Sequence, residues 1–170
     1  MARSRRSASQ RAPRSSMTVE REAVVGAPPV IVRRALTEGE LVKRWWSAWS
    51  GCAVDDATLD ARPGGLYSVT STTRYGTEHF VRGAFVELGA SRIVVTWRTD
   101  LAPESVSVVS FDLESAGRRG TRVVLRHTEL EPAEERMQME EGWDRILAVM
   151  RRGIPLLRGE ASTPEGALGA

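Results

Sequence analysis

The chain has 170 residues, of which 41% are hydrophobic and 27% are charged. This length favours one domain with a substantial core, because a chain of this size buries roughly 68–70% of its unfolded surface. No apolar run approaches the roughly 18 residues that a membrane-spanning helix needs. Length and composition therefore argue against two full domains and against a membrane span.

The net charge of +2 is unevenly distributed. Residues 1–16 hold five arginines and no acid, whereas the rest of the chain has 19 basic and 22 acidic residues. A weakly acidic body argues against nucleic-acid binding by the domain, because such binding needs a basic face. We interpret residues 1–16 as a disordered basic tail, or as an extension upstream of a start at Met17, residues 17–158 as the domain, and residues 159–170 as a flexible tail.

Two features favour a cytoplasmic protein. The basic N-terminus is not followed by the apolar stretch of a secretory signal. The single cysteine, Cys52, cannot form an internal disulfide, which suits a reducing compartment.

The first elements are a strand and two short helices. Residues 18–25 alternate loosely, and the pattern ends at Gly26-Ala27-Pro28-Pro29, where Pro29 suits the first position of a helix. Residues 37–40, Thr-Glu-Gly-Glu, match a capping box in which Thr37 and Glu40 satisfy free amides of a second helix. That helix should run into Trp45 and Trp46.

From residue 51 to residue 128 the pattern predicts six short strands. Five segments with turn residues separate them, at 62–65, 75–77, 89–91, 101–103 and 115–120. Consecutive strands with short connections usually pair with each other, so we expect an antiparallel meander. Because side chains repeat every second residue, Trp97 and His127 should both point to the buried face.

The remaining pattern is helical. After Glu131-Pro132, apolar residues recur at three- and four-residue spacings and define one stripe: Met139, Trp143, Ile146, Leu147, Met150, Ile154 and Leu157. This order predicts an α+β helix-grip fold, a curved antiparallel sheet wrapped round a long C-terminal helix. A curved sheet cannot touch a straight helix everywhere, so a cavity between them is the expected site.

Four stretches carry a resemblance to a known family. They are Ala35–Thr37 leading to Arg44–Trp46, Asp60–Gly65, Gly83–Leu88 with Ile93–Trp97, and Gly120–Leu125 followed by Gly142-Trp143. In this order they resemble the START-like (SRPBCC, Bet v-type) superfamily, and within it the bacterial relatives of the C-terminal domain of the activator of heat-shock protein 90 ATPase. The resemblance implies a pocket for an apolar ligand beneath the long helix. It implies no particular ligand, because the superfamily includes binders, cyclases, hydroxylase subunits and co-chaperones.

The side chains expected to surround such a ligand come from the inward strand faces, the second helix and the helix stripe. They are Trp46, Tyr67, Phe80, Trp97, Phe111, His127, Met139, Trp143, Leu147 and Met150. Two interpretations stay open for most of them. The Trp and Met residues either form pure core or also line the pocket, and a buried His127 either hydrogen-bonds the ligand or is satisfied internally.

Catalysis has little support in the sequence. Cys52 and His127 could form a nucleophile and a base, but their spacing matches no known arrangement. The two histidines, His79 and His127, lack the spacing of metal ligands, so we predict no metal, cofactor or catalytic residue. The leading hypothesis is a non-catalytic domain that binds or senses a small apolar molecule. The alternatives are a cyclase- or aromatase-type enzyme that encloses its substrate, and a co-chaperone-like module with a protein partner or a second copy as homodimer.

Overall fold

The computed structural model describes residues 17–46, 51–130 and 133–160. Strand β1 (Met17–Val25) is followed by helices α1 (Pro29–Thr37) and α2 (Gly39–Trp45). Six strands come next: β2 (Cys52–Leu59), β3 (Leu66–Thr73), β4 (Glu78–Leu88), β5 (Arg92–Thr99), β6 (Ser107–Ser115) and β7 (Thr121–Leu130). The long helix α3 (Ala133–Gly153) continues into a 3₁₀ segment, η2 (Ile154–Glu160). This confirms the predicted order. The proposed N-terminal tail, residues 1–16, lies outside the described residues. So does the proposed C-terminal tail, residues 159–170, except for residues 159–160 at the end of η2.

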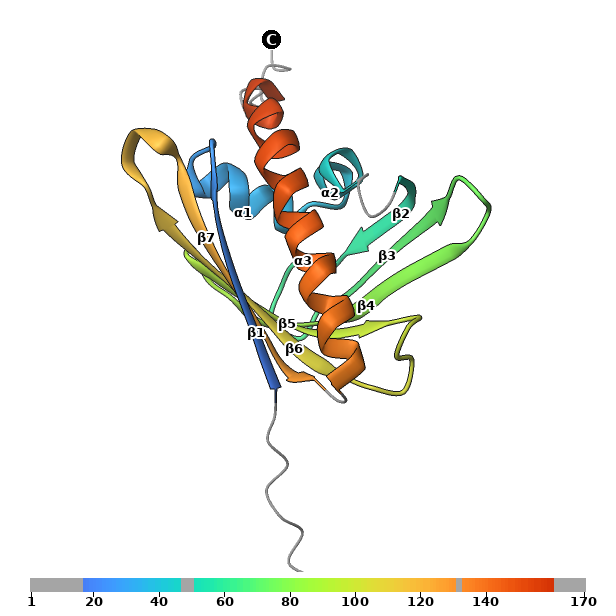
Figure 1. Ribbon diagram of the computed structural model, residues 1–170. Coiled ribbons are helices and arrows are strands. Elements are labelled where there is room, and N and C mark those ends of the chain that lie inside the picture. The colour runs from blue at the N-terminus through green and yellow to red at the C-terminus, as the bar shows by residue number, and fades with distance from the viewer. Residues whose placement is uncertain (1–16, 47–50, 131–132, 161–170) are drawn as a thin grey trace, which may run out of the picture.

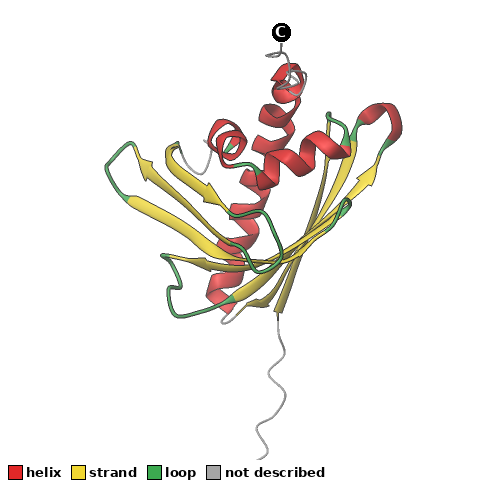
Figure 2. Ribbon diagram, turned by 180° about the vertical axis from the view of Figure 1, so that it is seen from behind, coloured by secondary structure: helices red, strands yellow, loops and turns green. Residues whose placement is uncertain are grey.

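All seven strands belong to one antiparallel sheet with the order β1-β7-β6-β5-β4-β3-β2. The six later strands pair in sequence as a meander, and β1 adds to the edge at β7, with Ala23 opposite Val123. Figures 1 and 2 show that the two ends of the sheet bend toward each other on either side of α3. The fold is therefore the predicted helix grip, and we call the face that α3 covers the inner face and the opposite one the outer face.

The first two helices form as predicted, but the predicted capping box is wrong. Pro29 occupies the first turn of α1. Thr37 is the last residue of α1, and its hydroxyl donates to the carbonyl of Arg33, one turn earlier. The residue that precedes α2 is Glu38, which makes no side-chain cap. Only one residue separates the helices, so Thr37 remains in α1 and cannot cap α2.

The turn between β2 and β3 shows how glycine determines local structure. Gly64 has a φ of +81°, a region that residues with a side chain rarely adopt. Gly65 has an ordinary φ, but a Cβ there would lie 1.9 Å from the carbonyl oxygen of Asp60. The two glycines are thus required for different reasons, one for conformation and the other for space.

Helix α3 closes the core with the stripe that the sequence predicts. Its stripe residues are all buried, as are Ile154 and Leu157 of η2. The α-helix ends at Gly153, two residues before Pro155, where the chain tightens into the 3₁₀ segment. Facing the stripe, Ile93, Val95 and Trp97 of β5 and Val123, Leu125 and His127 of β7 are buried on the inner face, as the alternation predicts.

Candidate functional site

Trp97 lies at the centre of an aromatic cluster on the inner face. Its ring centroid is 4.9 Å from that of Trp143 on α3 and 6.1 Å from that of His127 on β7. On the other side Trp46, which follows α2, stacks on it with a centroid distance of 6.2 Å and an interplanar angle of 18°. Phe111 meets the edge of Trp143 at 6.1 Å. Sheet, α2 and α3 therefore meet at this cluster.

Beside this cluster lies a cavity of about 50 Å³ between the sheet and α2. Every residue that lines it is apolar or aromatic: Leu36, Val42, Trp45, Trp46, Leu59, Tyr67, Val69, Phe85, Ile93, Val95, Trp97 and Phe111. Four of these, Trp46, Tyr67, Trp97 and Phe111, are among the predicted ligand residues. The other eight were missed, although Val69 shares the inward parity of Tyr67 and could have been found from that signal.

The remaining predicted residues lie elsewhere. His127 and Met139 line a second space of about 20 Å³ with Trp97, on the other side of the cluster. Trp143, Leu147 and Met150 are buried and line neither space. The helix stripe packs directly on the sheet because its large side chains fill the gap that a straight helix would leave.

Phe80 is the predicted residue that the structure does not bring into the cluster. It has the parity of Arg82 on β4, and the guanidinium of Arg82 lies over its ring, 4.2 Å from the centroid. The inward positions of this strand are held instead by Val81 and Phe85, which are both buried. Phe80 therefore faces the outer side of the sheet.

His127 is fully satisfied by neighbouring protein groups. The indole N–H of Trp143 donates to Nδ1 at 3.0 Å, so the ring proton is on Nε2, which lies 2.6 Å from the hydroxyl of Ser107. That hydroxyl in turn donates to the carbonyl of Trp97 at 3.2 Å. Burial lowers the pKa of His127 to about 4, so the ring is neutral at physiological pH. Of the two interpretations of His127, these contacts favour the one in which its hydrogen bonds go to protein groups and not to a ligand.

His127 is not available as a base for Cys52. Both ring nitrogens of His127 are engaged by Trp143 and Ser107. Burial raises the pKa of the Cys52 thiol, with the negative charges of Asp100 and Asp55 adding to the effect, so the nucleophilic thiolate is disfavoured. Across the described residues, no three His, Cys, Asp or Glu side chains gather as they would around a metal ion.

A more polar pocket of about 40 Å³ lies on the far side of Trp46. Trp46 and Val69 line both this pocket and the apolar cavity. In the pocket, Nδ1 of His79 is 2.8 Å from the carboxylate of Asp100. No pattern in the sequence indicates that these two residues meet. Trp97 lines the apolar cavity and not this pocket. Its Nε1 is the one buried side-chain nitrogen or oxygen in the described part of the chain that has no hydrogen-bond partner.

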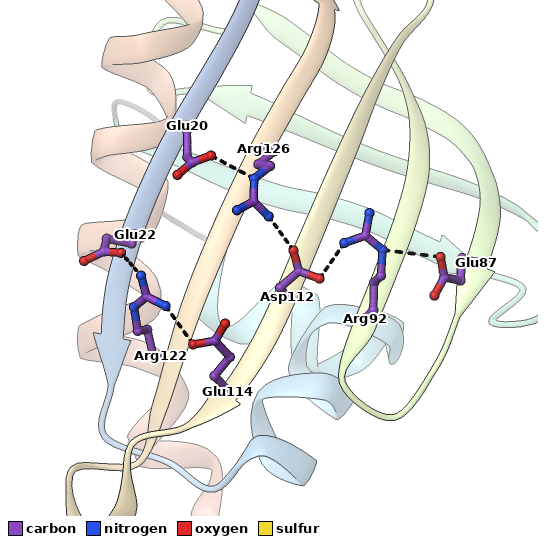
Figure 3. Close-up of polar contacts among 8 residues, drawn as sticks. All are labelled: Glu20, Glu22, Glu87, Arg92, Asp112, Glu114, Arg122 and Arg126. Atoms are coloured by element: carbon purple, nitrogen blue, oxygen red, sulfur yellow. Dashed lines mark hydrogen bonds and ion pairs between the residues drawn. The ribbon is translucent and has the colours of Figure 1, made fainter.

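The outer face of the sheet carries charge in a regular pattern (Figure 3). On this face Asp112 accepts hydrogen bonds from Arg92 at 2.6 Å and from Arg126 at 2.7 Å. Arg126 also donates to Glu20, and Arg92 pairs with Glu87 at 3.4 Å. In a second group on the same face, Arg122 donates hydrogen bonds to Glu22 and to Glu114. Each of these arginines thus lies between two carboxylates.

Comparison with known proteins gives the family. Residues 26–152 match the family described as Activator of Hsp90 ATPase homolog 1-like protein. The chain belongs to this family. No curated protein matches the sequence.

Solved structures of Activator of Hsp90 ATPase homolog 1-like proteins and other bacterial proteins share the fold. An AHSA1 protein from Silicibacter pomeroyi is 26% identical, with a TM-score of 0.67 over 84% of this chain and 99% of that chain. An AHSA1-like protein from Aeromonas hydrophila is 18% identical, with a TM-score of 0.67 over 90% and 100% of the two chains. A protein from Rhodobacter sphaeroides is 17% identical, with a TM-score of 0.70 over 83% and 93%. The last two show the fold alone.

The family membership agrees with the predicted START-like resemblance and leaves the ligand open. None of the described helices is long and apolar enough to cross a membrane. Membership of the family does not determine the function, because one fold supports many functions.

Proposed function

We propose that the protein binds a small, mostly apolar molecule in the cavity between the sheet and α2, without converting it. The observation that carries this proposal is a cavity of about 50 Å³ with an entirely apolar lining, one wall of which is the half-buried Trp46. At about 24 cal/mol per Å³, such a cavity costs about 1 kcal/mol of folding free energy. A ligand that fills it restores the missing contacts.

The size of the cavity limits what it accepts without a change of shape. Drug-sized ligands occupy roughly 300–1,000 Å³, far more than the 50 Å³ between sheet and α2. Trp46 is the wall best able to yield, because it follows the last turn of α2 and one of its ring contacts is the stack on Trp97. Losing such a stack costs about 0.5–1.5 kcal/mol beyond the area exposed. A larger ligand therefore takes the place of the Trp46 ring.

The polar groups near Trp46 suggest the chemistry of the ligand. If the Trp46 ring moves, the apolar cavity joins the pocket that holds His79 and Asp100. Trp97 is one of the residues that line the cavity, and its buried indole N–H lacks an acceptor among the described residues. A buried donor without a partner costs about 1–3 kcal/mol. The ligand class that fits has an apolar body and one hydroxyl or carbonyl group.

The experiment is a titration with 2-naphthol followed by ¹H–¹⁵N NMR. Binding should shift the indole signals of Trp46 and Trp97. Val69→Phe places a ring where the cavity and the pocket meet and should abolish binding, whereas Val86→Phe, on an exposed position, should leave it unchanged. Trp46→Ala, which enlarges the space, should raise affinity about tenfold.

Two results would contradict the proposal. One is the absence of indole shifts at saturating 2-naphthol in the wild type. The other is equal binding by Val69→Phe and Val86→Phe, provided that thermal unfolding shows both variants to be folded. In either case the apolar cavity would be a packing defect of the core.

One observation favours a cyclase-type enzyme as a second candidate. Asp100 holds Nδ1 of His79 at 2.8 Å, the arrangement that orients an imidazole as a general base, and Nε2 has no partner among the described residues. A linear triketone that the wild type cyclises would support this candidate. His79→Gln should then abolish cyclisation while 2-naphthol binding persists. No cyclisation by the wild type would reject it.

A further inference from the structure

A hollow of about 640 Å³ lies on the outer face, on the opposite side of the sheet from the apolar cavity. Its lining comes from β2, β3, β4 and β5 and from the connection between β5 and β6. The residues are Thr58, Leu66, Tyr67, Ser68, Phe80, Arg82, Gly83, Ala84, Thr96, Arg98, Pro103 and Val106. Its volume falls within the range of small-molecule sites.

Gly83 and Ala84 of β4 and Thr96 of β5 line the hollow where side chains bond to the backbone of these strands. The backbone N–H of Ala84 donates to the hydroxyl of Thr96 at 2.8 Å, and the hydroxyl of Tyr67 donates to the carbonyl of Thr96 at 2.7 Å. Side chains thus satisfy the backbone N–H of Ala84 and the carbonyl of Thr96. A Cβ on Gly83 would lie 1.9 Å from the same carbonyl, so a glycine is needed there. The base of the hollow is therefore part of the sheet, and the connection between β5 and β6 adds Pro103 and Val106 to its wall.

Two arginines stand side by side in this hollow. Arg82 and Arg98 are directly opposite each other on β4 and β5, and both are exposed. Neither makes an ion pair with any residue in the described ranges 17–46, 51–130 and 133–160; Arg82 lies over the ring of Phe80. Like charges directly opposite each other destabilise a sheet. The stability of the fold therefore does not explain this pair.

The other arginines of the outer face that Figure 3 draws have carboxylate partners, whereas Arg82 and Arg98 have none among the described residues. Arg92, Arg122 and Arg126 each lie between two carboxylates of neighbouring strands (Figure 3). On the same sheet, Arg82 and Arg98 have each other as cross-strand neighbours instead. A bound anion would give them the partner that the other arginines already have.

The neighbouring side chains define what kind of anion fits. Two guanidinium groups hold a carboxylate through paired, charge-assisted hydrogen bonds. Ser68 is the cross-strand partner of Arg82 on the other side, and its hydroxyl adds a further polar group. Leu66, with 71% of its surface exposed, and Val106, with 47%, provide an apolar wall. From this geometry we infer that the hollow binds a small amphipathic carboxylate, with its charge at Arg82 and Arg98 and its apolar body against Leu66 and Val106.

The test uses naphthalene-2-carboxylate and its neutral analogue, naphthalene-2-carboxamide, in NMR titrations of the full chain. The carboxylate should shift the amides of Ser68, Arg82 and Arg98 and bind about tenfold more tightly than the carboxamide. The double variant Arg82→Gln/Arg98→Gln should lose about tenfold in affinity. The matched control Arg118→Gln/Arg119→Gln removes the same charge from an exposed turn and should stay within about twofold of the wild type. Added salt should weaken binding of the carboxylate.

Several results would overturn the inference. Equal binding of carboxylate and carboxamide would show that the arginines do not recognise charge. Unchanged affinity in the Arg82→Gln/Arg98→Gln variant would have the same meaning. Shifts confined to the indole signals of Trp46 and Trp97 would assign the probe to the apolar cavity. Binding of a tetraglutamate peptide but not of naphthalene-2-carboxylate would replace the small molecule by an acidic protein partner.

Discussion

The inner and outer faces of the sheet are stabilised in different ways. On the inner face, His127 is completely buried, neutral, and held by single hydrogen bonds to Trp143 and Ser107. On the outer face, Arg126 and its neighbours form charge pairs that water reaches. A buried polar group without its partner costs much more than an exposed ion pair without its partner. The inner face should therefore respond strongly to substitution and pH, and the outer face weakly and in a salt-dependent way.

On each face, the residues of the proposed site depart from the way in which that face is stabilised. On the inner face nearly every polar group is satisfied, and the exception in the described chain, Nε1 of Trp97, lies on a residue that lines the apolar cavity. On the outer face Arg82 and Arg98 are the cross-strand pair that breaks the alternation of charge. The proposed inner site thus contains the residue with the unsatisfied polar group, and the proposed outer site contains the arginines that have no carboxylate neighbours across the described strands.

The largest expected effect is the pH dependence that His127 gives to the inner face. The unfolded chain protonates this ring below its ordinary pKa of 6.5, whereas the folded protein does so only near pH 4. The stability that neutral His127 contributes is therefore fully present above pH 6.5 and is lost as the pH falls from 6.5 to about 4. The difference corresponds to about 3 kcal/mol. Urea unfolding at several pH values from 7 to 4 measures it.

Variants of the two histidines isolate this contribution. His127→Gln keeps a donor and an acceptor but does not titrate, so its free energy of unfolding should fall by about 3 kcal/mol less than that of the wild type over this pH range. His79→Gln should retain the full loss. If His127→Gln and the wild type lose the same stability, protonation of His127 does not govern the acid sensitivity of the inner face.

The next effect concerns the charged chain on the outer face. Asp112 accepts from Arg92 and Arg126, and 20% of its side chain is exposed. Asp112→Asn should lower the free energy of unfolding by about 1 kcal/mol, the upper end for exposed ion pairs, because one residue serves two arginines. Thermal or urea unfolding in low salt measures the loss, which should shrink in 1 M NaCl, where the Debye length is about 3 Å.

The matched control for this variant is Glu114→Gln. Glu114 pairs with Arg122 alone, and 56% of its side chain is exposed. Its loss should stay within about 0.5 kcal/mol. If both variants lose the same stability, the charged chain does not act as a network centred on Asp112.

Much of the fold could be predicted because each element has a local signal. Glycine and proline mark the turns at 62–65 and 101–103, and the period-two pattern places Trp97 and His127 on the inner face. The capping box at Thr37 failed because a local motif cannot show that α1 extends through it. Phe80 was misplaced because Phe80 and Phe85 have opposite parities on one strand, and both are apolar.

The candidate sites were harder to predict because they depend on the register between strands. The pairing of His79 with Asp100, and of Arg82 with Arg98, follows only from how β4 lies against β5. The apolar cavity is lined by residues of α1, α2 and strands β2 to β6, and the helices meet these strands through packing rather than through spacing in sequence. Periodicity predicts which face a side chain occupies, but not its neighbour on the next strand.

The smallest expected effect is a gain in the free energy of unfolding rather than a loss, and it comes from a substitution in the proposed outer site. Arg82→Gln removes one of two like charges that face each other across β4 and β5, so it should raise the free energy of unfolding by a few tenths of a kcal/mol. The same change at Arg126, which lies between Glu20 and Asp112, should lower it by about 0.5–1 kcal/mol. Urea unfolding in low salt measures both, and 1 M NaCl should bring both variants toward the wild type. A loss of stability in Arg82→Gln would show that this arginine supports the sheet, through its contact with the ring of Phe80. A gain would show that the protein retains Arg82 at a cost to its stability, as expected of a residue that binds an anion.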